Sequence, residues 1–112
     1  MPAATYNLTI EQGSDFAIQL TLSEDGSAKN LTGYSARAQM RQKKTDASPS
    51  ATFTCTVTDA ANGQVKMALG NSTTTALTAG IYFYDLELFT DNDDIVTRLL
   101  EGQATVVAEV TK

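Results

Sequence analysis

Apolar and polar residues alternate with a period of two along most of this chain. Successive side chains of a β-strand point to opposite faces of the sheet, so this period is typical of strands with one buried face. A helix would instead repeat its apolar residues every three or four positions. The clearest alternation runs through five segments: 16–22, 34–41, 52–58, 64–69 and 81–88.

Residues that favour tight turns lie between these segments. Residues 24–27 contain Asp-Gly, residues 59–63 end in Asn-Gly, and residues 90–94 are mostly Asp and Asn. These residue types favour turns because they tolerate positive φ or hydrogen-bond to their own backbone. Residues 42–50 form a longer polar loop. The chain therefore consists of short strands that are joined mainly by hairpin-type connections.

The remaining segments complete an all-β prediction. Residues 6–10 predict a short first strand, whereas residues 95–100 and 103–110, rich in Val, Leu and Ile, predict the last strands. Residues 72–77 predict one helical turn, capped by Asn71 or by the Ser that follows it. We therefore predict an immunoglobulin-like antiparallel β-sandwich of about seven or eight strands with at most one short helical turn.

One local pattern refines this fold prediction. The segment from Leu77 to Tyr82, which includes Gly80, has the form L-x-x-G-x-Y. In immunoglobulin-like sandwiches, a tyrosine near the start of a late strand hydrogen-bonds back to the backbone of the preceding corner. We predict that Tyr82 forms such a tyrosine corner. The alternative is a buried tyrosine that only packs against Tyr84.

Composition excludes several classes of function. A chain of 112 residues predicts a single domain, residues 1–112. The absence of histidine excludes Ser-His-Asp catalysis and histidine metal sites, and Cys55, the one cysteine, is expected to be a buried and inert thiol. A net charge of −5 argues against a nucleic-acid partner. The sequence shows no membrane-spanning run and no signal peptide, and it predicts no cofactor.

Two acidic groups are candidates for chemical sites. Asp85 and Glu87 share one face of a predicted strand, as paired catalytic carboxylates would. Because the opposite face is apolar, we expect both to face solvent instead. Asp91, Asp93 and Asp94 crowd one turn and supply oxygen ligands that suit calcium, but a turn explains the same residues without a metal. We expect no enzymatic activity, and we leave calcium binding open.

A third feature predicts a contact surface. Ile81, Phe83 and Phe89 alternate with the core positions of the same strand, so all three point outward if the strand is buried on one side only. A stripe of exposed apolar groups indicates an interface. Arg37 and Arg41 belong to the basic cluster of the chain and would form its polar rim. The alternative is a strand that is buried on both faces.

Several turn-and-strand motifs resemble those of a known family. They are Gln12-Gly13 at an early turn, Leu31-Thr32-Gly33 before a strand, and Gly80-Ile81-Tyr82 at the late corner. With these motifs the chain resembles small virion proteins of tailed bacteriophages, and it is similar to the immunoglobulin-like N-terminal domain of phage baseplate upper proteins. The motifs contain no catalytic residue.

The resemblance implies a non-enzymatic structural protein of the virion. Such a protein would lie in the tail or baseplate and attach subunits or fibres by shape-complementary burial, with edge-strand pairing by its terminal strands. Its partners would be other virion proteins, and a homo-oligomer is possible. One alternative is a capsid decoration protein. Another is a carbohydrate-binding module for host adhesion, although a chain without tryptophan is poorly suited to one.

Overall fold

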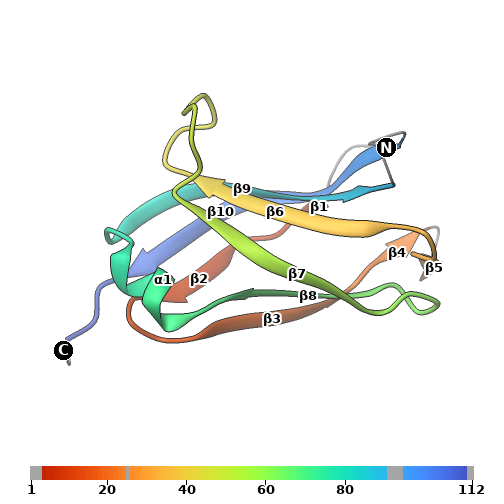
Figure 1. Ribbon diagram of the computed structural model, residues 1–112, viewed down its shortest axis with the longest axis horizontal. Helices are drawn as coiled ribbons and strands as arrows, with labels where there is room; N and C mark the ends of the chain where they lie inside the picture. Colours follow the sequence, from red (N-terminus) through yellow and green to blue (C-terminus); the bar gives the residue numbers. More distant parts are fainter. Residues whose placement is uncertain (1–3, 25, 91–94, 111–112) are drawn as a thin grey trace.

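The computed structural model describes residues 4–24, 26–90 and 95–110 (Figure 1). The molecule is elongated, with principal extents of 42 × 27 × 24 Å. Its elements are β1 (Ala4–Thr5), β2 (Leu8–Glu11), β3 (Phe16–Thr21), β4 (Ser23–Glu24), β5 (Ser27–Ala28), β6 (Ser35–Arg41), β7 (Ala51–Asp59), β8 (Gln64–Leu69), α1 (Asn71–Ala76), β9 (Gly80–Phe89) and β10 (Val96–Val107).

The main strands form one continuous path that folds over on itself. The order is β1-β10-β9-β6-β7-β8-β3, and β2 also pairs with β10. The fold occurs at β7, whose first residues, Ala51–Phe53, pair with β6, whereas its later residues, from Thr54 onward, pair with β8. In Figure 1, β7 crosses diagonally from the layer of β6, β9 and β10 to the layer of β8 and β3. The two layers thus share one strand and face each other.

The core lies between these layers and follows the predicted alternation. Of the alternating residues of β9, Tyr82, Tyr84, Leu86 and Leu88 are buried. Their neighbours in β6 and β8 include Met40 and Met67, which are fully buried. Truncating one such side chain to alanine costs about 2–5 kcal/mol, so this stripe accounts for much of the free energy of folding.

The two ends of the chain meet in a parallel pairing. Both β1 and β2 run alongside β10, in register with Leu100–Glu101 and with Ala104–Val107 respectively. The prediction of two final strands separated near residues 101–102 is wrong, because β10 continues through Gly102. A Cβ atom at Gly102 would overlap the carbonyl oxygen of Tyr6, so glycine here permits close approach rather than a turn.

The predicted first strand is likewise divided differently. Residues 6 and 7 separate β1 from β2, each of which pairs with β10, yet both residues still contact β10. The Tyr6 N–H donates to the Glu101 carbonyl oxygen at 2.9 Å, and the Asn7 side-chain oxygen accepts the Gln103 N–H at 3.1 Å. Sequence alternation alone does not reveal this break, because both segments continue along the same partner strand.

The short helix α1 is held by side chains that are distant in sequence. Its N-cap residue is Gly70, without a side-chain cap, so the predicted cap at Asn71 or Ser72 is wrong. The Asn71 N–H instead donates to the Asp15 carboxylate at 2.8 Å. The hydroxyl of fully buried Thr74 donates to the Ser14 carbonyl oxygen at 2.8 Å and accepts the Gly13 N–H at 3.1 Å. The turn between β2 and β3 therefore anchors the helix.

The predicted all-β fold with one short helical turn is confirmed. Its strands pair antiparallel as predicted, except that β1 and β2 pair with β10 in parallel. Seven of the described strands have four or more residues, in agreement with the predicted seven or eight. The two-residue strands β1, β4 and β5 are additional, and β4 and β5 form a small hairpin where a simple turn was predicted. Across the described residues, no helix has the length and apolar character required to cross a bilayer.

Candidate interaction surface

The outer face of the sheet formed by β6, β9 and β10 carries most of the candidate residues. Strand register aligns side chains from the three strands in rows across this face. The rows are Ser35, Phe89 and Val96; Arg37, Glu87 and Arg98; Gln39, Asp85 and Glu101; and Arg41, Phe83 and Gln103. We call this surface the outer face. It is apolar towards both ends of β9 and charged in the middle.

One end of the outer face is organised by Arg37. Its Nε lies 3.0 Å from the Glu87 carboxylate on the neighbouring strand. The same guanidinium lies over the Phe89 ring, 4.4 Å from the ring centroid. A cation at this distance is attracted by the electron-rich face of the ring. Arg37 therefore covers an outward apolar group while it neutralises an acidic one.

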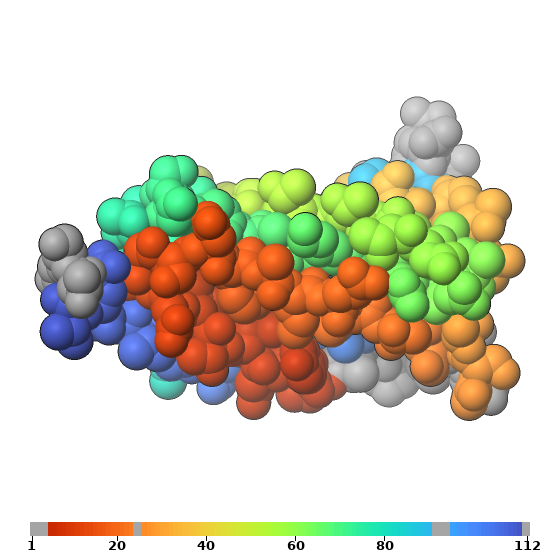
Figure 2. Space-filling model, turned by 90° about the horizontal axis from the view of Figure 1, so that it is seen from below, coloured from red at the N-terminus to blue at the C-terminus, as the bar shows by residue number. Residues whose placement is uncertain are grey.

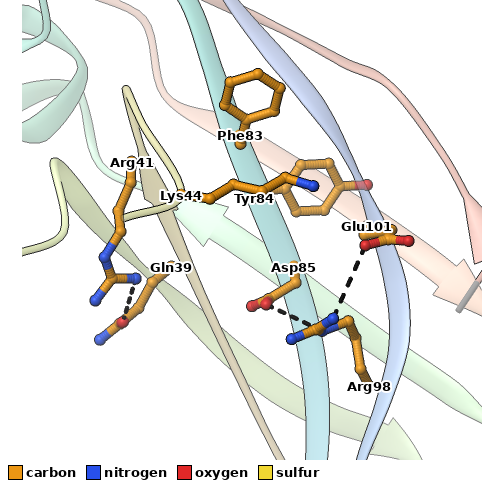
Figure 3. Close-up of a pocket in the computed structure, with 8 residues that line it drawn as sticks. All are labelled: Gln39, Arg41, Lys44, Phe83, Tyr84, Asp85, Arg98 and Glu101. Carbon is orange, nitrogen blue, oxygen red and sulfur yellow. Dashed lines mark hydrogen bonds and ion pairs between the residues drawn. The ribbon is translucent and has the colours of Figure 1, made fainter. Parts of the chain in front are cut away.

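The middle of the outer face holds a second arginine between two carboxylates. The Nε of Arg98 lies 3.2 Å from the Asp85 carboxylate, and its Nη1 lies 4.0 Å from that of Glu101 (Figure 3). Partial burial raises the pKa of Asp85 above its ordinary value, and the positive charge of Arg98 opposes this rise. Asp85 is therefore a partly desolvated carboxylate whose charge depends on its arginine neighbour.

A shallow pocket opens beside these residues towards the other end of β9. Arg41 donates from Nη1 to the Gln39 side-chain oxygen at 3.0 Å and from Nε to the Asp46 carbonyl oxygen at 3.1 Å. The second bond holds the 42–50 loop against β6. From that loop the Lys44 ammonium reaches over the Phe83 ring, 5.6 Å from its centroid. Figure 3 shows these groups converging on a pocket of about 140 Å³.

The predicted contact residues occupy the outer face, but they do not form one bare apolar stripe. Ile81 is 56% exposed. Phe83 and Phe89 point outward and are half-buried, because Lys44 and Arg37 respectively lie over their rings. The charged rows of Asp85 and Glu87 separate the two phenylalanines. Any partner would therefore meet cation-covered aromatic rings at both sides of a charged centre.

The residues predicted for the tyrosine corner lie together at the start of β9. The Tyr82 hydroxyl donates to the Thr78 carbonyl oxygen at 2.7 Å, which is the bond that such a corner requires. Gly80 has a φ of 146°, a region that favours glycine, and Leu77 is buried beneath the corner. The Gln12 side-chain amide donates to the Leu77 carbonyl oxygen at 2.8 Å and ties the corner to the first turn.

Sequence reasoning did not identify two charged residues of the outer face, Arg98 and Glu101, and it placed Lys44 in the basic cluster without its contact to Phe83. Arg98 and Glu101 lie three residues apart, which a regular strand would place on opposite faces. A register shift between Arg98 and Leu100 brings both onto the outer face. Lys44 lies in a loop whose path depends on the bond between Arg41 and Asp46. No sequence signal indicates either arrangement.

The remaining candidate groups offer little chemistry. Burial raises the pKa of the Cys55 thiol to about 11, so the thiolate is scarce near neutral pH. The predicted calcium ligands Asp91, Asp93 and Asp94 lie outside the described residues. Within residues 4–24, 26–90 and 95–110, no three Cys, Asp or Glu side chains gather as metal ligands would.

Comparison with known proteins relates the fold to a phage domain. No protein-family model matches the sequence, and no curated protein matches it significantly. Among solved structures, the N-terminal domain of phage TP901-1 ORF48 matches with a TM-score of 0.55 at 13% identity, over 97% of this chain and 99% of that chain. This likeness shows a shared fold along the whole domain.

A second solved structure resembles the chain less closely. It is a family 123 glycoside hydrolase from Clostridium perfringens, which matches at 10% identity over 97% of this chain and 24% of that chain. The TM-score of 0.40 is too low to show a shared fold.

Proposed function

We propose that this chain is a non-enzymatic structural protein of a tailed-bacteriophage virion, with an immunoglobulin-like sandwich that attaches subunits or fibres in the tail or baseplate. The observation that carries this proposal is the fold shared over nearly all of both chains with the N-terminal domain of phage TP901-1 ORF48. The motif glycines fit this interpretation as structural positions: Gly13 and Gly33 at turns and Gly80 at the first residue of β9 all have positive φ.

The outer face is the surface that we propose for attachment. Its rings, Phe83 and Phe89, supply apolar area, and the cations that lie over them, Lys44 and Arg37, supply polar contacts to a partner. Protein interfaces are enriched in aromatic and arginine side chains, and both types are present here in contact with each other. A partner that displaces Lys44 from Phe83 would gain an apolar contact without any change in the backbone.

An aromatic platform for sugars has less support. All eight Phe and Tyr residues lie in the described part of the chain, and of these only Tyr6 is exposed. Stacking on a sugar ring requires an uncovered aromatic face, whereas Arg37 and Lys44 cover the outward phenylalanines. Binding to proteins therefore agrees better with this surface than binding to glycans.

Quantitative mass spectrometry of purified virions tests the proposed location. We expect this chain in the particle at a copy number far below that of the major capsid protein. A ratio close to that of the capsid protein would favour the capsid-decoration alternative. Absence from the particle would refute a virion role.

A matched pair of variants tests the proposed surface. Phe83→Ala removes apolar area from the outer face, whereas Val110→Ala removes it from a side chain that is 97% exposed and lies beyond the end of β10. We expect reduced incorporation into particles for Phe83→Ala only, with unchanged thermal unfolding for both variants. If Phe83→Ala unfolds the domain, Phe83 belongs to the core. If both variants assemble normally, the attachment surface lies elsewhere.

A further inference from the structure

Strand β3 is the end of the strand path and carries an open edge. It pairs with β8 on one side, through all six residues from Phe16 to Thr21. Within the described residues, no strand pairs with its other side. Figure 2 looks at the molecule from this side, where β3 runs in orange along the surface next to β8 in green. This edge is therefore accessible along its length.

The direction of one hydrogen bond shows which backbone groups point away from β8. The Leu22 N–H donates to the Gly63 carbonyl oxygen at 2.8 Å, towards the β8 side. Because backbone groups alternate in direction along an antiparallel strand, the N–H and C=O groups of Ala17, Gln19 and Thr21 turn to the open edge. Three donors and three acceptors thus lack a strand partner within the described fold.

The β3 edge lacks the features that normally prevent strands from pairing between molecules. Proteins protect open edges with lysine, proline, bulges or very short strands. The sequence of β3, FAIQLT, has no charged residue and no proline, and its register with β8 is unbroken. The edge at the opposite end of the path has such protection, because β2, which pairs with β10 there, has only four residues and ends in Glu11. The later part of β7, which pairs with β8 alone, is also irregular, because its register shifts between Val57 and Asp59.

The inward side chains of β3 also remain partly uncovered. Phe16, Ile18 and Leu20 pack against the core, yet all three are only half-buried. Apolar side chains at the end of a sheet remain exposed on the side where the next strand would lie. A strand added to β3 would therefore bury these three groups in addition to pairing the backbone.

We infer that β3 pairs antiparallel with β3 of a second copy of this chain, about a two-fold axis that passes between the two Gln19 residues. In this register Gln19 faces its own equivalent, and Ala17 faces Thr21 in both directions. These three pairs use every outward backbone group, giving about six hydrogen bonds, two for each pair. Ile18 and Leu20 then lie opposite each other on the inward face. Sheets from both molecules would join into one.

A second copy suits this edge better than a charged segment of another protein. The edge carries no charge with which to select an acidic or basic peptide. The chain has a net charge of −5, so self-association requires a contact that brings no carboxylates together. The β3 edge meets this condition, because none of its six residues is acidic. This inference does not depend on the proposed virion role.

Two variants that introduce opposite charges at Gln19 test the pairing directly. The side chain is exposed, and its amide donates to the Gln64 side-chain oxygen at 3.0 Å. Gln19→Lys places two ammonium groups on directly opposed residues of the pair, and Gln19→Glu does the same with carboxylates. We expect sedimentation equilibrium to show a concentration-dependent dimer for the unmodified chain. We expect each variant alone to weaken the dimer by at least about tenfold, and an equimolar mixture of both to restore it.

Gln103→Lys is the matched control. Gln103 is also an exposed glutamine on a strand, but β10 has neighbours on both sides. This variant should dimerise like the unmodified chain, and circular dichroism should show all variants folded. A chain that remains monomeric at about 1 mM would overturn the inference, since edge pairing of this kind gives at least weak association. Equal weakening by Gln19→Lys and Gln103→Lys, or a mixture that does not restore the dimer, would also overturn it.

Discussion

Gly102 lies in the middle of β10, where a larger residue would be expected on propensity alone. A Cβ atom there would overlap the Tyr6 carbonyl oxygen and approach the Asn7 side chain. We predict that Gly102→Ala displaces this segment and loses three hydrogen bonds. They are the Tyr6 N–H bond to β10 at 2.9 Å, the Tyr84 hydroxyl bond to the Tyr6 carbonyl oxygen, and the Gln103 N–H bond to Asn7 at 3.1 Å.

The expected magnitude follows from these bonds. Each contributes about 1 kcal/mol, and alanine returns about 0.5–1 kcal/mol by restricting the unfolded chain. The net loss in the free energy of unfolding is therefore about 2 kcal/mol, or a fall in Tm of roughly 10 °C for a domain of this size. Urea denaturation and calorimetry measure both quantities, and amide exchange should show that Gln103 loses protection.

Gly70→Ala is the control for this prediction. Gly70 has an ordinary φ of −75°, and no heavy atom lies within 4 Å of a Cβ built on it. Its unfolding free energy should stay within about 1 kcal/mol of the unmodified chain. The argument from close approach would be refuted if Gly102→Ala were as stable as the Gly70→Ala control, with full protection of the Gln103 amide.

Three further predictions concern buried polar groups. Thr74→Val leaves the Ser14 carbonyl and the Gly13 N–H without their bonds, and should cost about 2 kcal/mol in urea denaturation. Tyr82→Phe removes the corner bond to Thr78, and should lower the free energy of unfolding by about 1–2 kcal/mol. The circular dichroism spectrum of the folded variant should equal that of the unmodified chain. Because burial raises the thiol pKa of Cys55 from 9.0 to about 11, iodoacetamide at pH 8 should alkylate the folded chain on the order of a hundredfold more slowly than the unfolded chain; equal rates would contradict its burial.

Alternation along the sequence was sufficient to predict the strands that form the core. It failed where pairing depends on contacts between distant residues. The sequence predicts an interruption at Gly102, because the role of this glycine depends on Tyr6, which is distant in sequence. The sequence does not predict the start of α1 correctly, because the acceptor for the Asn71 N–H, Asp15, comes from the turn between β2 and β3.

The candidate surface likewise has some features that the sequence predicts and others that it does not. The outward direction of Ile81, Phe83 and Phe89 follows from the strand period, so the sequence was informative about their face. Their covering by cations was not predictable, because Lys44 reaches Phe83 from a loop and Arg37 reaches Phe89 from a neighbouring strand. Register and loop path depend on the whole fold, which a single sequence does not display.

The parallel pairing of the chain ends has a mechanical consequence. β2 and β10 run in the same direction, and the chain enters at one end of the molecule and leaves at the other (Figure 1). Force applied to the two termini therefore pulls these strands past each other along their length. The hydrogen bonds between these strands are then loaded in shear and must break together, whereas strands that are peeled apart lose their bonds one after another. A chain loaded through its ends should resist stretching until this terminal ladder slips, and only then should the domain unravel.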